Sequence, residues 1–447
     1  MLRNLSIAAV AALAVAPVGV FAQTTAAQAV APASDTAFLF NTLFMLLAGL
    51  LVMWMAVGFT MLEAGFVRSK NVAMQITKNI SAYAVAGAGF LIIGAALQNP
   101  VDGWAIDGFL SGTAPGWTGI EDAGSGAPGQ GGVASGGASF FLQLMFCATT
   151  ISIVSGAVAE RVRLIPFMLF ALAITSVIYP LQASWSWGGG FLADLGFVDH
   201  AGSVVVHTVG GWAALAGVVI LGPRVGKFRA DGRVNPLPGS SLPLSALGAL
   251  ILWFGWFGFN GGSAVMADAM QGAVDIGRVV VNTNAAGVGG VLAGIILTRA
   301  LYSKVDLTLV LNCGLAGLVS ITADPVHASP GLALIIGAIG GAIVVLGVPL
   351  LDRFRLDDVV GAVPVHLGAG IWGGVAAGFV NPEGSVIAQL VGIGLIGCFV
   401  FGVSIVMWFA LKLVIGLRFN PEVEADGLDL NELGLEAYPD FVGYEDA

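Results

Sequence analysis

Charged residues are scarce in this chain of 447 residues. Asp, Glu, Lys and Arg together make up 10% of it, whereas 57% is hydrophobic. Soluble globular proteins carry about 25% charged residues, so the composition excludes a chain whose surface faces water throughout. Apolar stretches of about 20 residues recur along the sequence, and this length crosses a bilayer as a helix. We therefore expect an all-α polytopic membrane protein.

Cysteine is also rare, and its placement excludes a disulfide framework. Cys147, Cys313 and Cys398 all fall inside apolar segments. No set of three or more His, Cys or acidic residues clusters as a catalytic zinc would need. No basic stripe indicates nucleic acid, and no nucleophile–base pair stands in the apolar segments. We expect neither an enzyme nor a cofactor.

The first 22 residues have the features of a cleavable secretory signal. Arg3 precedes a short apolar run that ends in small residues before Gln23. We expect cleavage near Ala22, followed by a periplasmic linker over 23–36. A first spanning helix that is retained is the alternative.

The rest of the chain reads as one membrane domain, 37–416, and an acidic tail, 417–447. We predict eleven spans: 37–62, 74–98, 137–159, 164–188, 203–222, 241–260, 274–298, 305–322, 331–350, 360–380 and 386–416. The loops 99–136, 189–202, 261–273, 323–330 and 381–385 contain no Lys or Arg, whereas cations follow the odd-numbered spans. The positive-inside rule then places the N-terminus outside and the C-terminus in the cytoplasm. Arg278, at the outer start of the seventh span, is the exception.

Eleven spans with this orientation allow two inverted five-helix repeats plus an eleventh helix. The fifth span carries Val206-His207 followed by GGWAALAG, and the tenth carries Val365-His366 followed by AGIWGGVAAG. An aspartate stands eight residues before each histidine. The repeat would place His207 and His366 at equivalent depth, facing one another.

Ionisable side chains within membrane spans default to a functional interpretation. A single such histidine is as readily explained by a structural hydrogen bond, but a matched pair favours transport. Neutral imidazole exchanges hydrogen bonds with small polar molecules and passes protons. His200 and His327 fall in outer loops, where we expect them to be solvated. Asp199 reads either as a helix cap or as a cation site, and the cap is favoured.

Aromatic residues gather at the outer ends of two spans. Trp187 precedes three glycines, and Trp256, Phe257 and Phe259 stand near Ser263. Interface anchoring explains many membrane tryptophans. An indole beside a serine hydroxyl would also bind a small cation, and composition alone leaves both interpretations open.

The chain resembles the ammonium transporter family (Amt/Mep/Rh), in its bacterial Amt branch. The matching stretches are MLEAGFVRSKNV (61–72), SGAVAERVR (155–163), WSWGGGFLADLGFVDHAGSVVVH (185–207), WFGWFGFNGGSA (253–264), DDVVGAVPVHLGAGIWGG (357–374) and GLRFNPEVEADGLDLNELGLEAY (416–438). The resemblance covers about residues 37–440. It implies ammonium transport across the inner membrane, in a homotrimer with one pore in each subunit.

The resemblance also assigns residues. Trp187, Ser263 and Phe146 would bind ammonium at the outer mouth, and Phe146 with Phe259 would form a stacked pair that closes the pore. Deprotonation there would let neutral ammonia pass, whereas potassium has no proton to lose. Size alone does not separate the two cations.

Below this gate, His207 and His366 would be hydrogen-bonded twin histidines that line the pore and relay the proton. Asp199 and Trp256 would support the site. Leu142 departs from the family, because some members carry a second vestibule phenylalanine there, and Phe141 is the adjacent candidate to replace it.

The tail carries nine acids and no Lys or Arg over 419–447. A solvated tail and an ordered cytoplasmic segment that contacts neighbouring subunits are the two interpretations, and the resemblance favours the second. It also implies a regulatory protein of the PII class as a possible partner. Leu433 stands where members often carry histidine.

Three other functions compete with transport of ammonium. A sensor would need an output domain, and none is recognised after the last span. An ion-coupled transporter of a larger solute would need a roomier polar site. The pair Trp187 and Ser263 at the outer mouth argues against a gas channel of the Rh branch.

Overall fold

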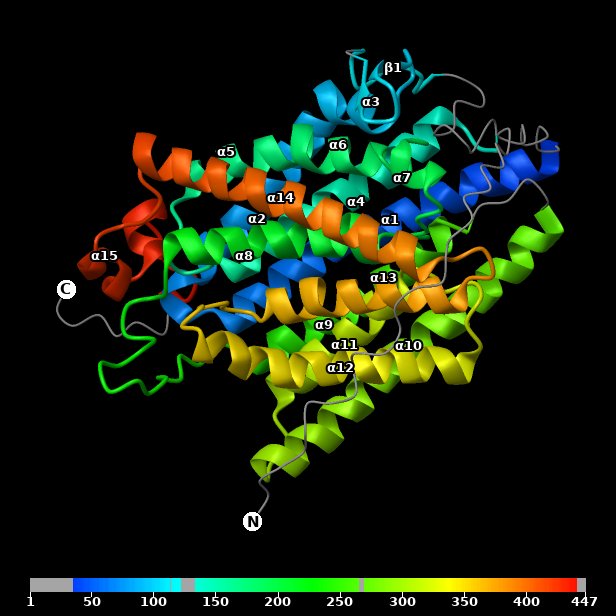
Figure 1. The fold of residues 1–447 in the computed structure, drawn as a ribbon. Helices are drawn as coiled ribbons and strands as arrows, with labels where there is room; N and C mark the ends of the chain where they lie inside the picture. Colours follow the sequence, from blue (N-terminus) through cyan, green and yellow to red (C-terminus); the bar gives the residue numbers. More distant parts are fainter. Residues whose placement is uncertain (1–34, 113, 122–132, 265–268, 440–447) are drawn as a thin grey trace, which may run out of the picture.

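The computed structural model describes residues 35–112, 114–121, 133–264 and 269–439. Within these ranges the chain is almost entirely helical. Figure 1 shows the long helices running side by side along one direction, with α15 near one end of the bundle. The predicted signal 1–22 and the linker up to residue 34 lie outside the described residues.

The elements follow one another as a series of long helices with short turns between them. They are α1 (Asp35–Phe66), η1 (Ser69–Asn71), α2 (Val72–Gly89), η2 (Phe90–Gly94), α3 (Ala95–Gln98), β1 (Trp104–Ile106), β2 (Leu110–Ser111), α4 (Gly136–Ala157), α5 (Leu164–Ala173), η3 (Ile174–Ile178), α6 (Tyr179–Ser184), α7 (Phe191–Asp194), η4 (Ser203–Thr208), α8 (Val209–Leu221), α9 (Leu242–Gly262), α10 (Ala269–Tyr302), α11 (Leu307–Ile321), α12 (Pro330–Arg353), η5 (Val363–Gly368), α13 (Ala369–Val380), α14 (Val386–Val414), α15 (Pro421–Asp426) and η6 (Asp429–Leu433). The two short strands form an antiparallel pair.

Each of the eleven predicted spans coincides with helical structure. Ten helical segments in the described part of the chain are long and apolar enough to cross a membrane. The remaining predicted span, 305–322, is the shorter apolar helix α11 of 15 residues. The fold is that of a multi-pass helical membrane protein, while the count of eleven and the orientation stay predictions.

Glycines let the helices approach one another closely, as membrane helix packing favours. A methyl group added to Gly248 of α9 would lie 2.2 Å from the backbone nitrogen of Leu62 in α1. A methyl group on Gly255 would lie 2.1 Å from Cγ of Met55. A side chain larger than hydrogen at either position would push α1 and α9 apart.

One end of the bundle, which we call the tail end, is held by buried ion pairs. Arg224 donates to both carboxylate oxygens of Asp357 at 2.8 and 2.9 Å and lies 3.3 Å from Glu160. Burial alone would raise the pKa of Asp357, but the hydrogen bonds and charge of Arg224 outweigh it and hold that pKa well below its usual range. The pair therefore stabilises the fold above the ordinary aspartate pKa of about 3.9, and this contribution is lost as the pH falls below that value.

The described part of the acidic tail is ordered against the tail end of the bundle. The backbone N–H groups of Ala73 and Met74, at the start of α2, donate to the Asp429 carboxylate at 2.9 and 2.7 Å. The N–H of Leu428 donates to Asn71, and Lys70 donates to the carbonyl of Ala425. Up to residue 439 the tail therefore packs on the bundle, whereas its cytoplasmic location and its contact with neighbouring subunits stay predictions.

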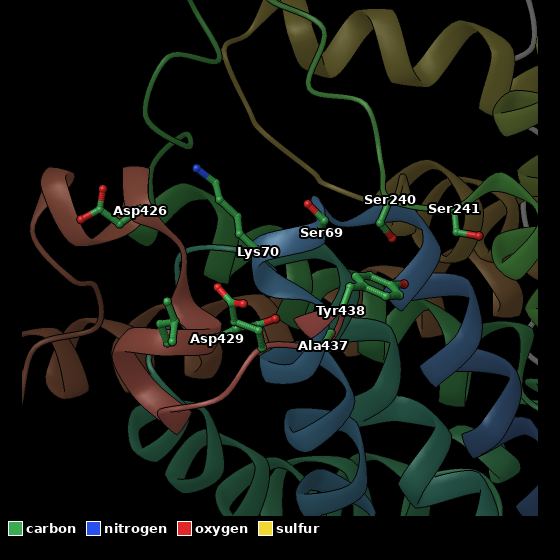
Figure 2. A pocket seen from close by; sticks show the side chains of 10 residues that line it. Ser69, Lys70, Ser240, Ser241, Asp426, Asp429, Ala437 and Tyr438 are labelled. Atoms are coloured by element: carbon green, nitrogen blue, oxygen red, sulfur yellow. The ribbon is translucent and has the colours of Figure 1, made fainter. Parts of the chain in front are cut away.

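A cavity of about 460 Å³ separates parts of the tail from the helix ends above it. Figure 2 shows Asp429, Ala437 and Tyr438 of the tail facing Ser69 and Lys70 across this space. The tail is thus held through a few specific contacts. The carboxylate of Asp429 provides two of these contacts, because it caps N–H groups at the start of α2.

Arg224→Gln should destabilise the protein by about 3–5 kcal/mol, since it removes the ion-pair partner of the buried Asp357 carboxylate. Glu160 keeps its ion pair with Arg68. Thermal unfolding of the purified protein measures the effect. Arg233→Gln is the matched control, because Arg233 pairs with Asp231 on the surface with 76% of its side chain exposed. Equal midpoints for the two variants would contradict the structural role of Arg224.

Asp429→Ala should release the tail from the bundle, because the α2 amides lose their acceptor. Hydrogen exchange over residues 421–433 should become faster, while exchange in α8 and α13 stays unchanged. Asp426→Ala is the control, since this aspartate is exposed on the same segment. Unchanged protection in Asp429→Ala would show that other contacts hold the tail.

Candidate functional site

The two predicted intramembrane histidines meet in the middle of the bundle. The Nδ1 atoms of His207 and His366 lie 3.3 Å apart, and their ring centroids lie 5.3 Å apart. Both side chains are buried, at 0% and 4% exposure. His207 belongs to η4 and His366 to η5, which are both π-helical turns. Such turns are frequent at functional sites because they re-aim a side chain within a helix.

Two glycines allow this contact. Gly211 stands four residues after His207, and a methyl group there would lie 2.6 Å from Cβ of Leu367 in η5. Gly370 stands four residues after His366, and a methyl group there would lie 2.5 Å from the carbonyl oxygen of Ser203 in η4. Each histidine-bearing helix thus presents a glycine to the other one's π-helical turn.

The hydrogen bond between the histidines fixes what the pair offers to a small molecule. With both rings neutral, one Nδ1 carries the shared proton and the other accepts it. The donating ring then has an accepting Nε2, and its partner has a donating Nε2. In the described part of the chain, Nε2 of His207 is buried without a hydrogen-bond partner. This atom can bind a small polar guest without displacing a protein contact.

Two stacked phenylalanine rings close the space next to His207. Phe146 of α4 and Phe259 of α9 have centroids 4.1 Å apart and ring planes inclined by 13°. Both are buried, at 1% and 0% exposure. The Phe259 ring lies 5.4 Å from the ring of His207. The structure therefore brings together all four residues predicted for the gate and the pore.

Trp256 packs directly against the first histidine. Its ring lies 4.9 Å from that of His207, inclined by 21°, and its indole N–H donates to the Thr322 hydroxyl at 2.8 Å. On the other side, Phe59 lies 6.2 Å from the ring of His366. Thr322 and Phe59 were not predicted, because an ordinary apolar pattern surrounds both.

Trp187 lies beside the gate, at the far end of the bundle from the tail. Its ring is 6.0 Å from that of Phe146, and its indole N–H donates to the Asp199 carbonyl at 2.7 Å. The Ser263 hydroxyl donates to the carbonyl of Phe259 at 3.2 Å. Trp187 and Ser263 thus lie beside Phe146 and Phe259, so the three residues predicted to receive a cation lie together.

Phe141 does not take the place of the phenylalanine that some family members carry at position 142. A methyl group added to Gly262, next to Ser263, would lie 3.2 Å from Leu142 Cδ2. The Phe141 ring instead packs on Gly49 of α1, where an added methyl group would lie 2.6 Å from it. Leu142 thus lies against Gly262 of α9, whereas Phe141 packs on α1.

Asp199 caps the helix that carries His207. Its carboxylate accepts hydrogen bonds of 2.8–3.0 Å from four successive backbone amides, 202–205. Burial raises the pKa of Asp199 to about 6, although these four donors oppose the rise. Asp358 occupies the equivalent place before η5 and accepts from Gly361 and Val363. Both contacts match the capping role favoured for Asp199.

The prediction for His200 is wrong. This ring is half-buried, and its Nε2 lies 3.2 Å from the carbonyl oxygen of Asn260. Burial lowers the pKa of His200. His327 is exposed as predicted, and its Nδ1 lies 3.0 Å from Asp324. A loop between spans can fold back into the bundle, and the hydropathy pattern does not reveal this.

A further acidic residue near the site went unrecognised. Glu63 of α1 is 1% exposed and lines the same small cavity as His366. The sequence did hold one indication of a buried acid: Lys78 lies within the predicted span 74–98, and a cation inside a span needs an anionic partner. Across the described residues, no group of three or more His, Cys, Asp or Glu could hold a metal ion.

The chain is similar to known proteins over most of its length. The model of the Ammonium Transporter Family matches residues 43–438. Ammonium transporter Amt2 of Archaeoglobus fulgidus is 37% identical over 89% of this chain and 88% of its own length. A putative ammonium transporter of Synechocystis is 38% identical over 92% of both chains.

Solved structures show the same fold. A protein described as Sensor Amt Protein superposes with a TM-score of 0.82 at 30% identity, over 89% of this chain and 99% of its own. Mep2 of Saccharomyces cerevisiae gives a TM-score of 0.75 at 25% identity, over 86% of this chain and 88% of its own. Family, relatives and fold coincide over nearly the whole chain: it belongs to the ammonium transporter family, a family of membrane transporters rather than enzymes.

Proposed function

We propose that this chain recruits NH4+ at the far end of the bundle, removes its proton at the phenylalanine gate and conducts NH3 past the two histidines. Trp187, Ser263 and Phe146 form the recruitment site. Phe146 and Phe259 form the gate, and His207 and His366 line the pore beyond it. The proton crosses separately, through the histidine pair.

One observation carries this proposal: the stacked phenylalanine pair lies directly against the buried histidine pair. An intact cation would lose its hydration in passing two apolar rings, and this is costly in a membrane interior. Ammonia is neutral and avoids most of that cost. Beyond the rings, the unpartnered Nε2 of His207 offers it a hydrogen bond.

The groups at the far end of the bundle would attract a cation only weakly, so that it binds there briefly. The Trp187 ring lies 6.0 Å from that of Phe146, and a contact between a cation and an indole ring contributes about 0.5–2 kcal/mol. The carboxylate of Asp199 is occupied by four backbone amides. Asp199 therefore acts by positioning the Trp187 loop and the His207 helix, and direct binding of the cation falls to the indole, the hydroxyl of Ser263 and the ring of Phe146.

Orientation and assembly follow from the charge pattern and the family. We place the tail end in the cytoplasm and the far end in the periplasm, in the inner membrane of the cell, with a signal peptide at 1–22. A homotrimer with one pore in each subunit is the proposed assembly. A PII-class regulator on the tail-end face is the proposed partner, since the ordered tail lies there.

Reconstituted protein in liposomes should give a current after an ammonium jump and none after a potassium jump. His207→Ala and His366→Ala should each lower the selective ammonium current at least about tenfold, because each removes one member of the proton-carrying pair. Solid-supported-membrane recording measures the current, and a pH dye inside the vesicles measures ammonia entry.

The two readouts separate the alternatives. Unchanged currents in both histidine variants would contradict the relay. Internal alkalinisation without current in the wild-type protein would indicate conduction of neutral ammonia alone. The absence of both signals would favour a sensor, which is how the structural neighbour with the TM-score of 0.82 is described.

Trp187→Leu should raise the ammonium concentration for half-maximal current by about two- to thirty-fold, which corresponds to the loss of a cation–π contact. The maximal rate of ammonia entry should change less, because the gate and pore remain. Trp117→Leu is the control, since Trp117 is 54% exposed in a loop. An unchanged half-maximal concentration in Trp187→Leu would remove this tryptophan from the recruitment site.

A further inference from the structure

A small cavity lies on the tail side of the histidine pair. It is lined by His366 and Glu63, together with Phe59, Ser152 and apolar residues of α11 and η5. Its volume is about 10 Å³, which is close to the space that one water molecule needs. An imidazole and a buried carboxylate therefore line one space the size of a single water.

The same cavity adjoins a larger vestibule at the tail end. Asn312, Val360 and Gly361 line both spaces. The vestibule has a volume of about 390 Å³, and its acids are Asp306, Asp352 and Asp358. Two of these shared residues are bonded to each other, because Asn312 Nδ2 donates to the carbonyl of Val360 at 2.8 Å.

The Glu63 carboxylate is held by hydrogen bonds from two neighbouring helices. Oε2 accepts from the amides of Gln75 and Asn79 in α2 and from the Ser155 hydroxyl in α4. Lys78 approaches the same cluster and donates to the Ser155 carbonyl at 2.8 Å. All these hydrogen bonds reach Oε2, so among the described residues Oε1 has no such donor.

A purely structural role explains this cluster incompletely. The carboxylate is the counter-charge of the buried Lys78 ammonium. This accounts for its charge, but not for its place on the cavity that His366 also lines. That space touches His366 on its tail side. Residues that cost stability and line a transport route default to a functional role.

We propose that Glu63 accepts the proton that leaves the histidine pair and delivers it to the tail-end vestibule. This inference rests on the proposed function, because it requires a proton that travels separately from ammonia. In the first step an N–H bond of the His366 imidazolium breaks and, through one water, an O–H bond forms at Oε1 of Glu63. In the second step this O–H bond breaks toward water in the vestibule, and the carboxylate is restored.

Glu63→Gln tests the inference, since it keeps the size and an oxygen acceptor for the α2 and α4 donors but does not carry the proton. The ammonium-driven current should fall at least about tenfold, while the rate of ammonia entry stays within about twofold of wild type. Asp426→Asn is the charge-matched control at the tail end, and it should alter neither readout. Glu63→Asp, which retains a carboxylate, should recover part of the current.

Every outcome decides the proposal. An unchanged current in Glu63→Gln overturns it, and so does an equal loss of current and ammonia entry, which would indicate packing alone. If Glu63→Gln does not fold, Glu63→Asp carries the test: its shorter side chain withdraws from the cavity, so the current should fall more than ammonia entry. Absence of current in the wild-type protein would overturn the proposed function itself, whereas a wild-type current that Glu63→Gln leaves intact overturns this inference alone.

Discussion

An ionisable side chain inside an apolar bundle needs partners, because neither lipid nor packed hydrocarbon replaces its hydration. This constraint decides where the buried ionisable groups of the chain lie. The two histidines satisfy one another through their Nδ1 atoms. Glu63 receives three donors from α2 and α4, and Asp357 receives Arg224. Each of these contacts joins side chains from different segments. The polar groups therefore help to fix how the helices pack, as well as lining the proposed transport route.

The same constraint arranges the site in sequence along the bundle. Trp187 stands beside the phenylalanine pair, and the pair stands against His207. The histidines come next, followed by the small cavity and the vestibule. In the proposed mechanism, the aromatic rings separate a mouth that attracts the cation from an interior that accepts the proton, and ammonium loses its proton where the rings begin.

Sequence patterns predicted the helices to within a few residues, because apolar length and charge asymmetry are local properties. His207 and His366 were also recognised, since a histidine in an apolar run is conspicuous. The π-helical turns that hold them were not, because hydrogen-bond register leaves no mark on hydropathy. Glu63 fell one residue beyond the predicted span 37–62, and its partners come from two other helices. His200 was assigned to solvent, since burial of a loop depends on the tertiary fold.

The reciprocal glycines explain why the two histidines cannot be positioned independently. Gly211 receives the backbone of η5, and Gly370 receives that of η4. Any side chain at one glycine would move the opposite π-helical turn, and with it the opposite histidine. A substitution at either glycine would therefore break the contact between the two Nδ1 atoms. Equal spacing of four residues in two helices of opposite predicted direction is what an inverted repeat requires. The geometry of the pair therefore depends on the packing of two helices against each other, and each histidine is oriented by the helix that carries its partner.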